Sequence, residues 1–204
     1  MGAEPAVIEL GVATSALHGR SGDRAVVARH GDRTLVAAID GLGHGEAAAE
    51  AADAAASILE RDGGSLEGLL RRCHEALRGT RGAVMTLAEF AAAPSLVTWV
   101  GVGNVEGRLV RAGADGFGAR PGGSGLAAPT LFGGVVGHNL PTVRPSSHPL
   151  HAGDVVVMAT DGVRANFADR VSALGEPQAV ADRILADAGR GDDDALVVVV
   201  RWLG

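Results

Sequence analysis

The amino-acid sequence predicts an α+β fold in which strands and helices occupy separate stretches of the chain. Strand patterns come first, two helical segments follow, a run of strands comes next, and a last helix precedes a last strand. This order favours antiparallel sheet with packed helices over alternating βαβ units. The length of 204 residues suits a single domain, 1–204, with a substantial core, and 47% hydrophobic with 21% charged residues is an ordinary globular composition.

Apolar periodicity, together with glycine and proline positions, predicts the elements in order. Ala25–His30 and Thr34–Ile39 form a β-hairpin around the two-residue turn Gly31-Asp32. The alanine-rich stretch after Gly45 is helical and stops at Gly63-Gly64. The predicted elements that follow the hairpin are helices at Gly45–Arg61 and Ser65–Arg78, strands at Ala83–Phe90, Leu96–Val102, Gly107–Arg111 and Thr130–Val136, a surface loop at Gly113–Ala128, a buried strand at Val155–Thr160, a helix at Pro177–Ala188 and a strand at Ala195–Trp202.

Composition and charge exclude several classes of protein. The formal net charge of -6 argues against a nucleic-acid binder, because phosphate contacts need a basic face. The single cysteine, Cys73, excludes an internal disulfide and a cysteine-rich zinc site. No continuous apolar stretch reaches the ~18 residues of a membrane span, and the N-terminus lacks a signal region. We therefore expect a cytoplasmic protein that binds neither nucleic acid nor membrane. The sequence leaves the oligomeric state open, and we take a monomer as the expectation.

Three predicted strands each carry an aspartate at one end. The apolar run Leu35–Ile39 leads into Asp40, and Val155–Thr160 leads into Asp161. Asp193 comes just before the last strand. If the last strand is antiparallel to the other two, the three carboxylates meet at one edge of the sheet.

The hairpin adds a fourth carboxylate. With a two-residue turn His30 pairs with Arg33, which places Asp23 directly opposite Asp40. Like charges facing each other are destabilising unless they are protonated or neutralised by cations. An all-oxygen site without cysteine suits Mg²⁺ or Mn²⁺, and it has room for two ions. Such ions lower the pKa of a bridging water and hold a phosphoryl oxygen, and Gly41, without a Cβ, lets its carbonyl approach an ion. The pattern therefore predicts metal-assisted hydrolysis of a phosphate ester.

In these segments the sequence resembles the metal-dependent protein phosphatase (PPM) family, in its SpoIIE-like bacterial branch. It is most similar to the stand-alone RsbX-type phosphatases of stressosome and sigma-factor control. The matching segments, in family order, are Ser21-Gly22-Asp23, Asp40–Gly45, Arg81–Thr86, Gly101–Val105, Gly153–Val155, Thr160–Val163 and Asp193–Ala195 leading into Val197–Arg201. The resemblance implies an αββα four-layer sandwich, with two mainly antiparallel sheets flanked by helices and a two-metal centre.

The resemblance also implies roles for individual residues. Asp40 would bridge two ions, Mn²⁺ or Mg²⁺, and the Gly41 carbonyl would bind one of them. Asp161 and Asp193 would bind the other ion, and Asp23 would act on the first one through water. The residues with supporting or chemical roles would be Asp194, lying behind the ligands, His44 as a general acid, and Arg20 as the nearest candidate to grip the phosphate.

The function implied is that of a serine/threonine protein phosphatase in which hydroxide activated by both metals attacks phosphorus. Its substrate would be a phosphorylated STAS-type regulator in a bacterial stress or second-messenger pathway. Two alternatives stay open: a non-catalytic module of the same fold that sequesters a partner, and a phosphatase for small esters. Taken alone, Asp161-Gly162 is an ordinary turn. Asp40–Gly45 could be a nucleotide-binding loop, but it lacks the GxGxxG spacing and the P-loop lysine.

Overall fold

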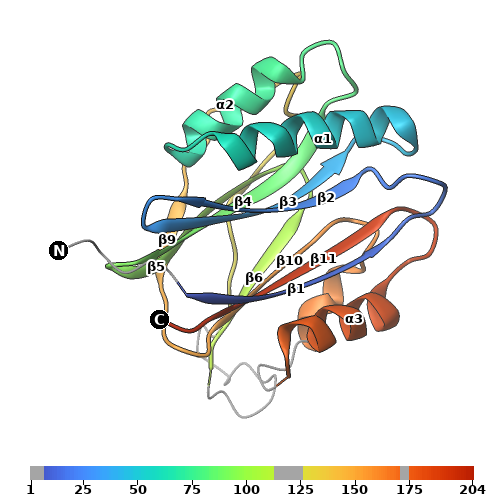
Figure 1. The fold of residues 1–204 in the computed structure, drawn as a ribbon. Helices are drawn as coiled ribbons and strands as arrows, with labels where there is room; N and C mark the ends of the chain where they lie inside the picture. The colour runs from blue at the N-terminus through green and yellow to red at the C-terminus, as the bar shows by residue number, and fades with distance from the viewer. Residues whose placement is uncertain (1–6, 113–125, 171–174) are drawn as a thin grey trace.

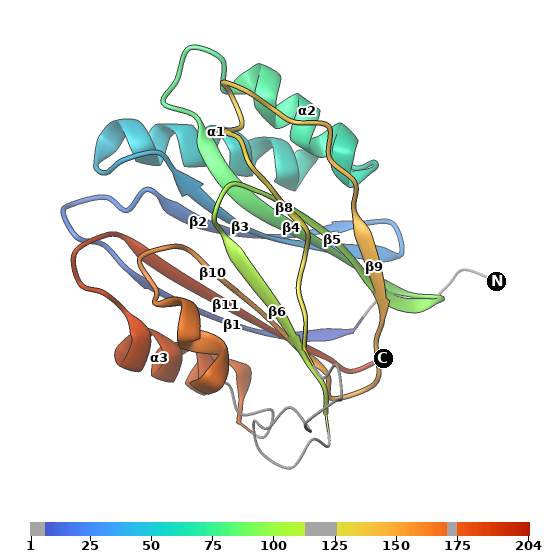
Figure 2. The ribbon, with the colours of Figure 1, turned by 180° about the vertical axis from the view of Figure 1, so that it is seen from behind.

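Two β-sheets stack face to face, and helices cover the outer face of each, as Figure 1 and Figure 2 show from opposite sides. This computed structural model describes residues 7–112, 126–170 and 175–204. The layers follow the order helix, sheet, sheet, helix, which confirms the predicted αββα sandwich.

The strands pair antiparallel almost throughout. The five-stranded sheet, here called the β1 sheet, contains in spatial order β1 (Ile8–Ser15), β11 (Ala195–Trp202), β10 (Val155–Ala159), β6 (Glu106–Val110) and β7 (Leu126–Ala127). The other, the β2 sheet, contains β2 (Asp23–His30), β3 (Arg33–Gly41), β4 (Ala83–Ala92), β5 (Ser95–Val102) and β8 (Leu131–Phe132), and β9 (Ser146–Pro149) also pairs with β5. Among the described strands only β5 and β8 run parallel.

The helices divide between the two outer faces. Helices α1 (Glu46–Arg61) and α2 (Leu66–Ala76) pack on the β2 sheet, where α1 contacts β2 and β3. Helix α3 (Pro177–Ala188) packs on β1 and β11, next to a short 3₁₀ helix at Ala165–Arg170. No described helix is both long and apolar enough to cross a membrane.

The apolar runs of the central strands are continuous because both of their faces are buried. On β3, Leu35, Ala37 and Ile39 pack in the layer shared with α1 and α2, whereas Val36 and Ala38 pack between the sheets. Side chains of a strand alternate between its two faces. Position 40 therefore continues the row that faces the space between the sheets.

The β1 sheet repeats this pattern. Val156 and Met158 of β10 pack between the sheets, and Val155 and Val157 pack towards α3. By the same alternation Thr160, just after β10, faces the inter-sheet space. The end of β3, at Asp40, and the residues just after β10, at Thr160, thus approach each other at one end of the inter-sheet core.

Several strands differ from the sequence prediction. The structure adds β1 and β9, which were not predicted. The predicted strand at Thr130–Val136 is reduced to β8 and isolated bridges, because Gly133 and Gly134 interrupt it. In the predicted loop Gly113–Ala128, residues 113–125 lie outside the described part, whereas Leu126–Ala127 form β7.

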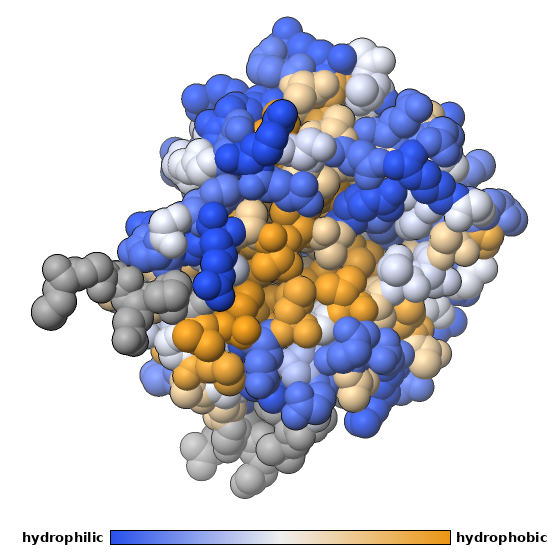
Figure 3. Space-filling model, in the orientation of Figure 1, coloured by the Kyte–Doolittle hydropathy of each residue, from blue (hydrophilic) through white to orange (hydrophobic). Residues whose placement is uncertain are grey.

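The inter-sheet core reaches the surface on one side of the molecule. Figure 3 shows apolar side chains across the centre of the face seen in Figure 1, where the edge strands β1 and β2 lie. Leu10 of β1 is 37% exposed and Val27 of β2 is 44% exposed.

Candidate metal centre

Two of the predicted carboxylates come from the β2–β3 hairpin. Asp23 is the first residue of β2 and Asp40 is the penultimate residue of β3, and the two are directly opposite in the antiparallel register. The turn pairs His30 with Arg33, so the predicted register is confirmed over the whole hairpin. Asp23 is 4% exposed, and Asp40 is partly buried.

The other carboxylates come from the opposite sheet. Asp161 follows β10, and Asp193 and Asp194 precede β11, which is antiparallel to β10. The expectation that all of these groups meet at the edge of one sheet is therefore wrong. Asp23 and Asp40 belong to the β2 sheet and the others to the β1 sheet, so the cluster closes one end of the core between the sheets.

Thr160 lies in a segment that matches the family, but no role was predicted for it; its side chain links the two sheets. The buried Thr160 hydroxyl donates to Asp23 Oδ2 at 2.8 Å and accepts a hydrogen bond from the Leu196 amide at 2.9 Å. The inward position of Thr160, two residues after Met158, is the sequence signal that could have identified it. This hydroxyl holds the Asp23 carboxylate against the end of β10.

Hydrogen bonds also fix the carboxylates of the β1 sheet. The Asn104 side-chain amide donates to Asp161 Oδ2 at 2.8 Å, a contact that the sequence reasoning did not foresee. The buried Asp194 accepts from the Leu17 amide at 2.8 Å and from the Gly22 amide at 2.7 Å. It thereby ties the loop that leads into β2 to the start of β11. Asp193 is exposed, and its Oδ1 accepts the amide of Asp194.

The pKa values of Asp23 and Asp40 reflect how close the aspartates of the two sheets lie to one another. The pKa of Asp40 is raised to about 8, chiefly by burial and then by the charges of Asp23 and Asp161. Burial is also the main reason that the pKa of Asp23 is raised to about 7. The hydrogen bond from Thr160 opposes this rise, and the charges of Asp194, Asp161 and Asp193 add to it. Carboxylates from both sheets therefore act on one another.

The donor set fits a hard divalent cation. Every side-chain candidate is a carboxylate, and the Asp40 carboxylate accepts no hydrogen bond from any described residue. Within the described part of the chain, no three His, Cys, Asp or Glu side chains form a ready-made cage. Mg²⁺ does not need one, because it keeps several waters and commonly takes only one or two protein carboxylates. The cluster is thus suited to hydrated Mg²⁺ or Mn²⁺ between the sheets.

Gly41 is required at its position for a reason that the sequence did not reveal. A Cβ on Gly41 would lie 2.1 Å from the carbonyl oxygen of Ala48, so a side chain there would push α1 off the sheet. The Gly41 amide donates to the Gly22 carbonyl at 3.0 Å. Close packing of helix on strand, and not only access of the carbonyl to an ion, explains this glycine.

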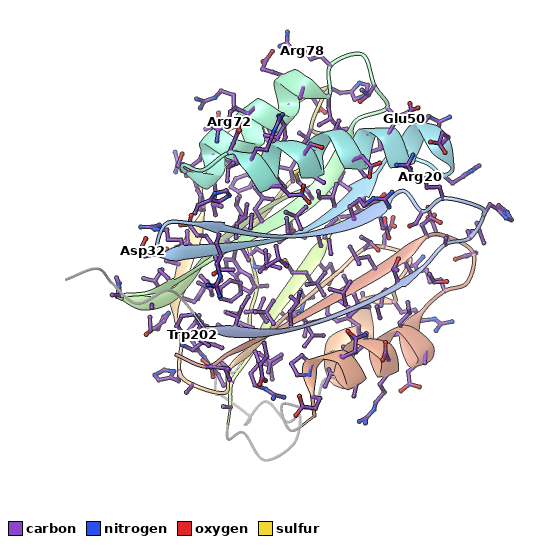
Figure 4. All side chains as sticks on the ribbon, viewed as in Figure 1. Arg20, Asp32, Glu50, Arg72, Arg78 and Trp202 are labelled. Carbon is purple, nitrogen blue, oxygen red and sulfur yellow. The ribbon has the colours of Figure 1, made fainter. Side chains whose placement is uncertain are left out.

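The other two residues with predicted roles, His44 and Arg20, lie near the start of α1. His44 is exposed in the connection from β3 to α1, and no described residue forms a hydrogen bond with it. Arg20 forms ion pairs with Glu46, at 2.5 Å, and with Asp53 of α1. Figure 4 shows it beside the start of that helix. The guanidinium of Arg20 is therefore already matched by two carboxylates.

A small pocket opens next to Asp161. Its lining includes the polar residues Asn104, Glu106 and Arg190 and the apolar residues Val163 and Phe167. The acidic cluster is thus accessible from solvent on the Asp161 side.

A four-layer αββα sandwich with an acidic cluster at the end of its inter-sheet core has the fold of the PPM phosphatases. The sequence profile of Stage II sporulation protein E (SpoIIE) matches residues 30–203, and the chain belongs to this family. Comparison with curated protein sequences gives no significant match.

Solved structures agree with this assignment. A protein described in work on the bacterial stressosome, a modular system adapted to control secondary messenger signaling, is 29% identical, with a TM-score of 0.83 over 96% of this chain and 100% of that one. RsbX in complex with magnesium is 20% identical, with a TM-score of 0.79 over 96% of this chain and 95% of RsbX. The PP2C phosphatase domain of SpoIIE from Bacillus subtilis, solved with a fragment of its regulatory domain, is 22% identical, with a TM-score of 0.73 over 97% of this chain and 64% of that one. The last two similarities establish the fold.

Proposed function

We propose that this chain, acting as one domain over residues 1–204, is a Mn²⁺- or Mg²⁺-dependent phosphatase for phosphoserine or phosphothreonine on a bacterial regulatory protein. The observation that carries the proposal is the meeting of Asp23 and Asp40 from one sheet with Asp161 and Asp193 from the other. Burial and mutual repulsion would keep such a cluster partly protonated near neutral pH, and divalent cations relieve that repulsion.

In this proposal each carboxylate has a separate role. Asp40 would contact two ions, sharing one with the Gly41 carbonyl and with Asp23 through water. Asp161 and Asp193 would hold the second ion. Two such ions would supply a water of lowered pKa and neutralise charge on the phosphoryl oxygens.

Other side chains would hold these ligands in place. Asn104 fixes one oxygen of Asp161, and Thr160 fixes one oxygen of Asp23. Asp194 anchors the loop before β2. His44, exposed at the start of α1, would donate a proton to the leaving seryl or threonyl oxygen.

The family and the fold neighbours support a regulatory protein as substrate. One neighbour is described in the context of the bacterial stressosome and another is RsbX. We therefore propose a phosphorylated STAS-type regulator as the partner, which places the reaction in the cytoplasm.

The direct test is hydrolysis of p-nitrophenyl phosphate and of phosphorylated STAS-type proteins by the purified chain. Activity is expected with Mn²⁺ or Mg²⁺ and should be lost with chelator and in Asp161→Asn. Asp32→Asn is the matched control, because Asp32 is exposed in the hairpin turn at the other end of the molecule (Figure 4). Failure of the wild type to hydrolyse either substrate with Mn²⁺ would contradict the proposal.

The same variant separates catalysis from sequestration. If a STAS-type partner is bound equally well by wild type and Asp161→Asn, and neither removes its phosphate, the chain is a binding module. If only the wild type releases phosphate, it is an enzyme.

A further inference from the structure

The proposed reaction brings a doubly charged phosphate to a strongly acidic end of the molecule. Cationic side chains near the cluster would favour its binding, provided that they are not already neutralised. Arg20 and Arg24 both form ion pairs with Asp53, so neither offers an unmatched guanidinium. Arg20, the phosphate-binding candidate suggested by the resemblance, is thus already neutralised by carboxylates of the protein and is poorly suited to bind a phosphate as well.

Arg81 lies beside the connection from β3 to α1. Gly41 pairs with Ala83 across the sheet, and the Leu42 amide donates to the Gly82 carbonyl at 3.0 Å. The backbone just before β4 therefore runs along the segment that follows Asp40. Arg81 is the next residue along this edge.

The guanidinium of Arg81 occupies the space that a side chain at position 43 would fill. A Cβ on Gly43 would lie 2.5 Å from Arg81 Nη1, and Gly43 has a φ of +87°, a conformation that L side chains rarely adopt. Glycine at this position thus leaves room for the arginine over the Asp40–Gly45 segment.

The backbone of Arg81 is fixed, whereas no carboxylate of residues 7–112, 126–170 or 175–204 pairs with its side chain. The Arg81 carbonyl lies 2.9 Å from His138 Nε2, and the Gly82 amide donates to the Thr80 hydroxyl at 3.0 Å. The Arg81 side chain is exposed, and in the described part of the chain no carboxylate lies within ion-pair distance of it. An anchored backbone with an unpaired guanidinium suits an anion from outside.

We propose that Arg81 binds the non-bridging oxygens of the substrate phosphate, in the place that the resemblance assigned to Arg20. This inference rests on the proposed function. The planar guanidinium offers two parallel N–H donors to a phosphate, a geometry that the ammonium of lysine cannot reproduce.

The test compares Arg81→Ala and Arg81→Lys with the wild type, using p-nitrophenyl phosphate as substrate and inorganic phosphate as inhibitor. Arg81→Ala should raise KM and the inhibition constant for phosphate about tenfold or more, as expected for loss of charged hydrogen bonds. Arg81→Lys should recover part of the affinity. The Mn²⁺ concentration for half-maximal activity should not change, because Arg81 does not hold the ions. As a readout without turnover, phosphate should raise the Tm of the Mg²⁺-loaded wild type and not that of Arg81→Ala.

Arg78→Ala is the matched control, since Arg78 is exposed and pairs only with Glu75 among the described residues (Figure 4). The inference is wrong if phosphate affinity is unchanged in Arg81→Ala, or if Arg20→Ala or Arg190→Ala produces the larger loss. An inactive wild type would instead contradict the proposed function, and the Tm measurement with phosphate still tests Arg81.

Discussion

Replacement of Asp40 by asparagine should stabilise the protein when no metal is bound. The pKa of Asp40 is raised from 3.8 to about 8. Each unit corresponds to ~1.4 kcal/mol, so the ionised carboxylate costs at most about 5 kcal/mol of folding free energy at pH 8. Solvent at the partly exposed side chain screens some of this cost, and we expect Asp40→Asn to recover roughly 2–3 kcal/mol. For a domain of this size that is a rise in Tm of about 4–12 °C.

The sign of the pH dependence provides a second readout. Because the folded-state pKa is raised, the folded protein between about pH 4 and pH 8 keeps a proton that the unfolded chain has already released. The metal-free wild type should therefore lose stability as the pH rises through this window. At pH 5 Asp40 is protonated, and the advantage of Asp40→Asn should shrink.

The assay is thermal unfolding followed by circular dichroism, in chelator and with Mn²⁺, at pH 5 and pH 8. Mn²⁺ should raise the Tm of the wild type at pH 8 and have little effect on Asp40→Asn. Asp32→Asn, in the exposed turn, should behave as the wild type does. The reasoning would be refuted if Asp40→Asn destabilised the metal-free protein at pH 8, or if Mn²⁺ stabilised the variant as much as the wild type.

Two further substitutions test the supports of the site. Thr160→Val removes the donor to Asp23 and a buried acceptor, so urea denaturation should show a loss of ~1–3 kcal/mol, and an unchanged midpoint would contradict this role. Gly41→Ala places a methyl group 2.1 Å from the Ala48 carbonyl oxygen and should lower the free energy of unfolding by ~1–3 kcal/mol or more. Gly133→Ala meets only open space and is the matched control. Equal denaturation midpoints for the two glycine variants would show that α1 moves aside without cost.

The sequence predicted best those elements whose local signal is strong. The two-residue turn fixed the pairing of β2 with β3, and with it the meeting of Asp23 and Asp40. Pro177–Ala188 and Ala195–Trp202 match α3 and β11, because proline starts the helix and the last strand is apolar on both faces.

The missed strands lack such signals. β9 is a polar Ser-Ser-His-Pro segment whose pairing with β5 depends on distant residues. β1 contains Gly11 at a close contact, where a Cβ would meet the backbone of Pro177 at 2.2 Å. Glycine disfavours a strand prediction locally, and only the packing of α3 explains why it is needed here.

The aspartates of the candidate site could be predicted from the sequence, whereas the side chains that form hydrogen bonds with them could not. An aspartate at a strand end is visible in the sequence, whereas the bonds from Thr160 to Asp23 and from Asn104 to Asp161 join residues far apart along the chain. The ion pairs of Arg20 were equally hidden, because they depend on how α1 lies over the loop before β2.

Exposed hairpin turns usually tolerate insertions and deletions, but the turn at Gly31-Asp32 should not. Arg33 and Asp40 lie at opposite ends of β3, roughly 20 Å apart at ~3.3 Å per residue. Deleting Asp32 or adding one residue would slip the register by one position and place Gly22 or Arg24, instead of Asp23, opposite Asp40. A change in length at a solvent-exposed tip would thus separate the carboxylates of the candidate metal centre, which the tip never touches.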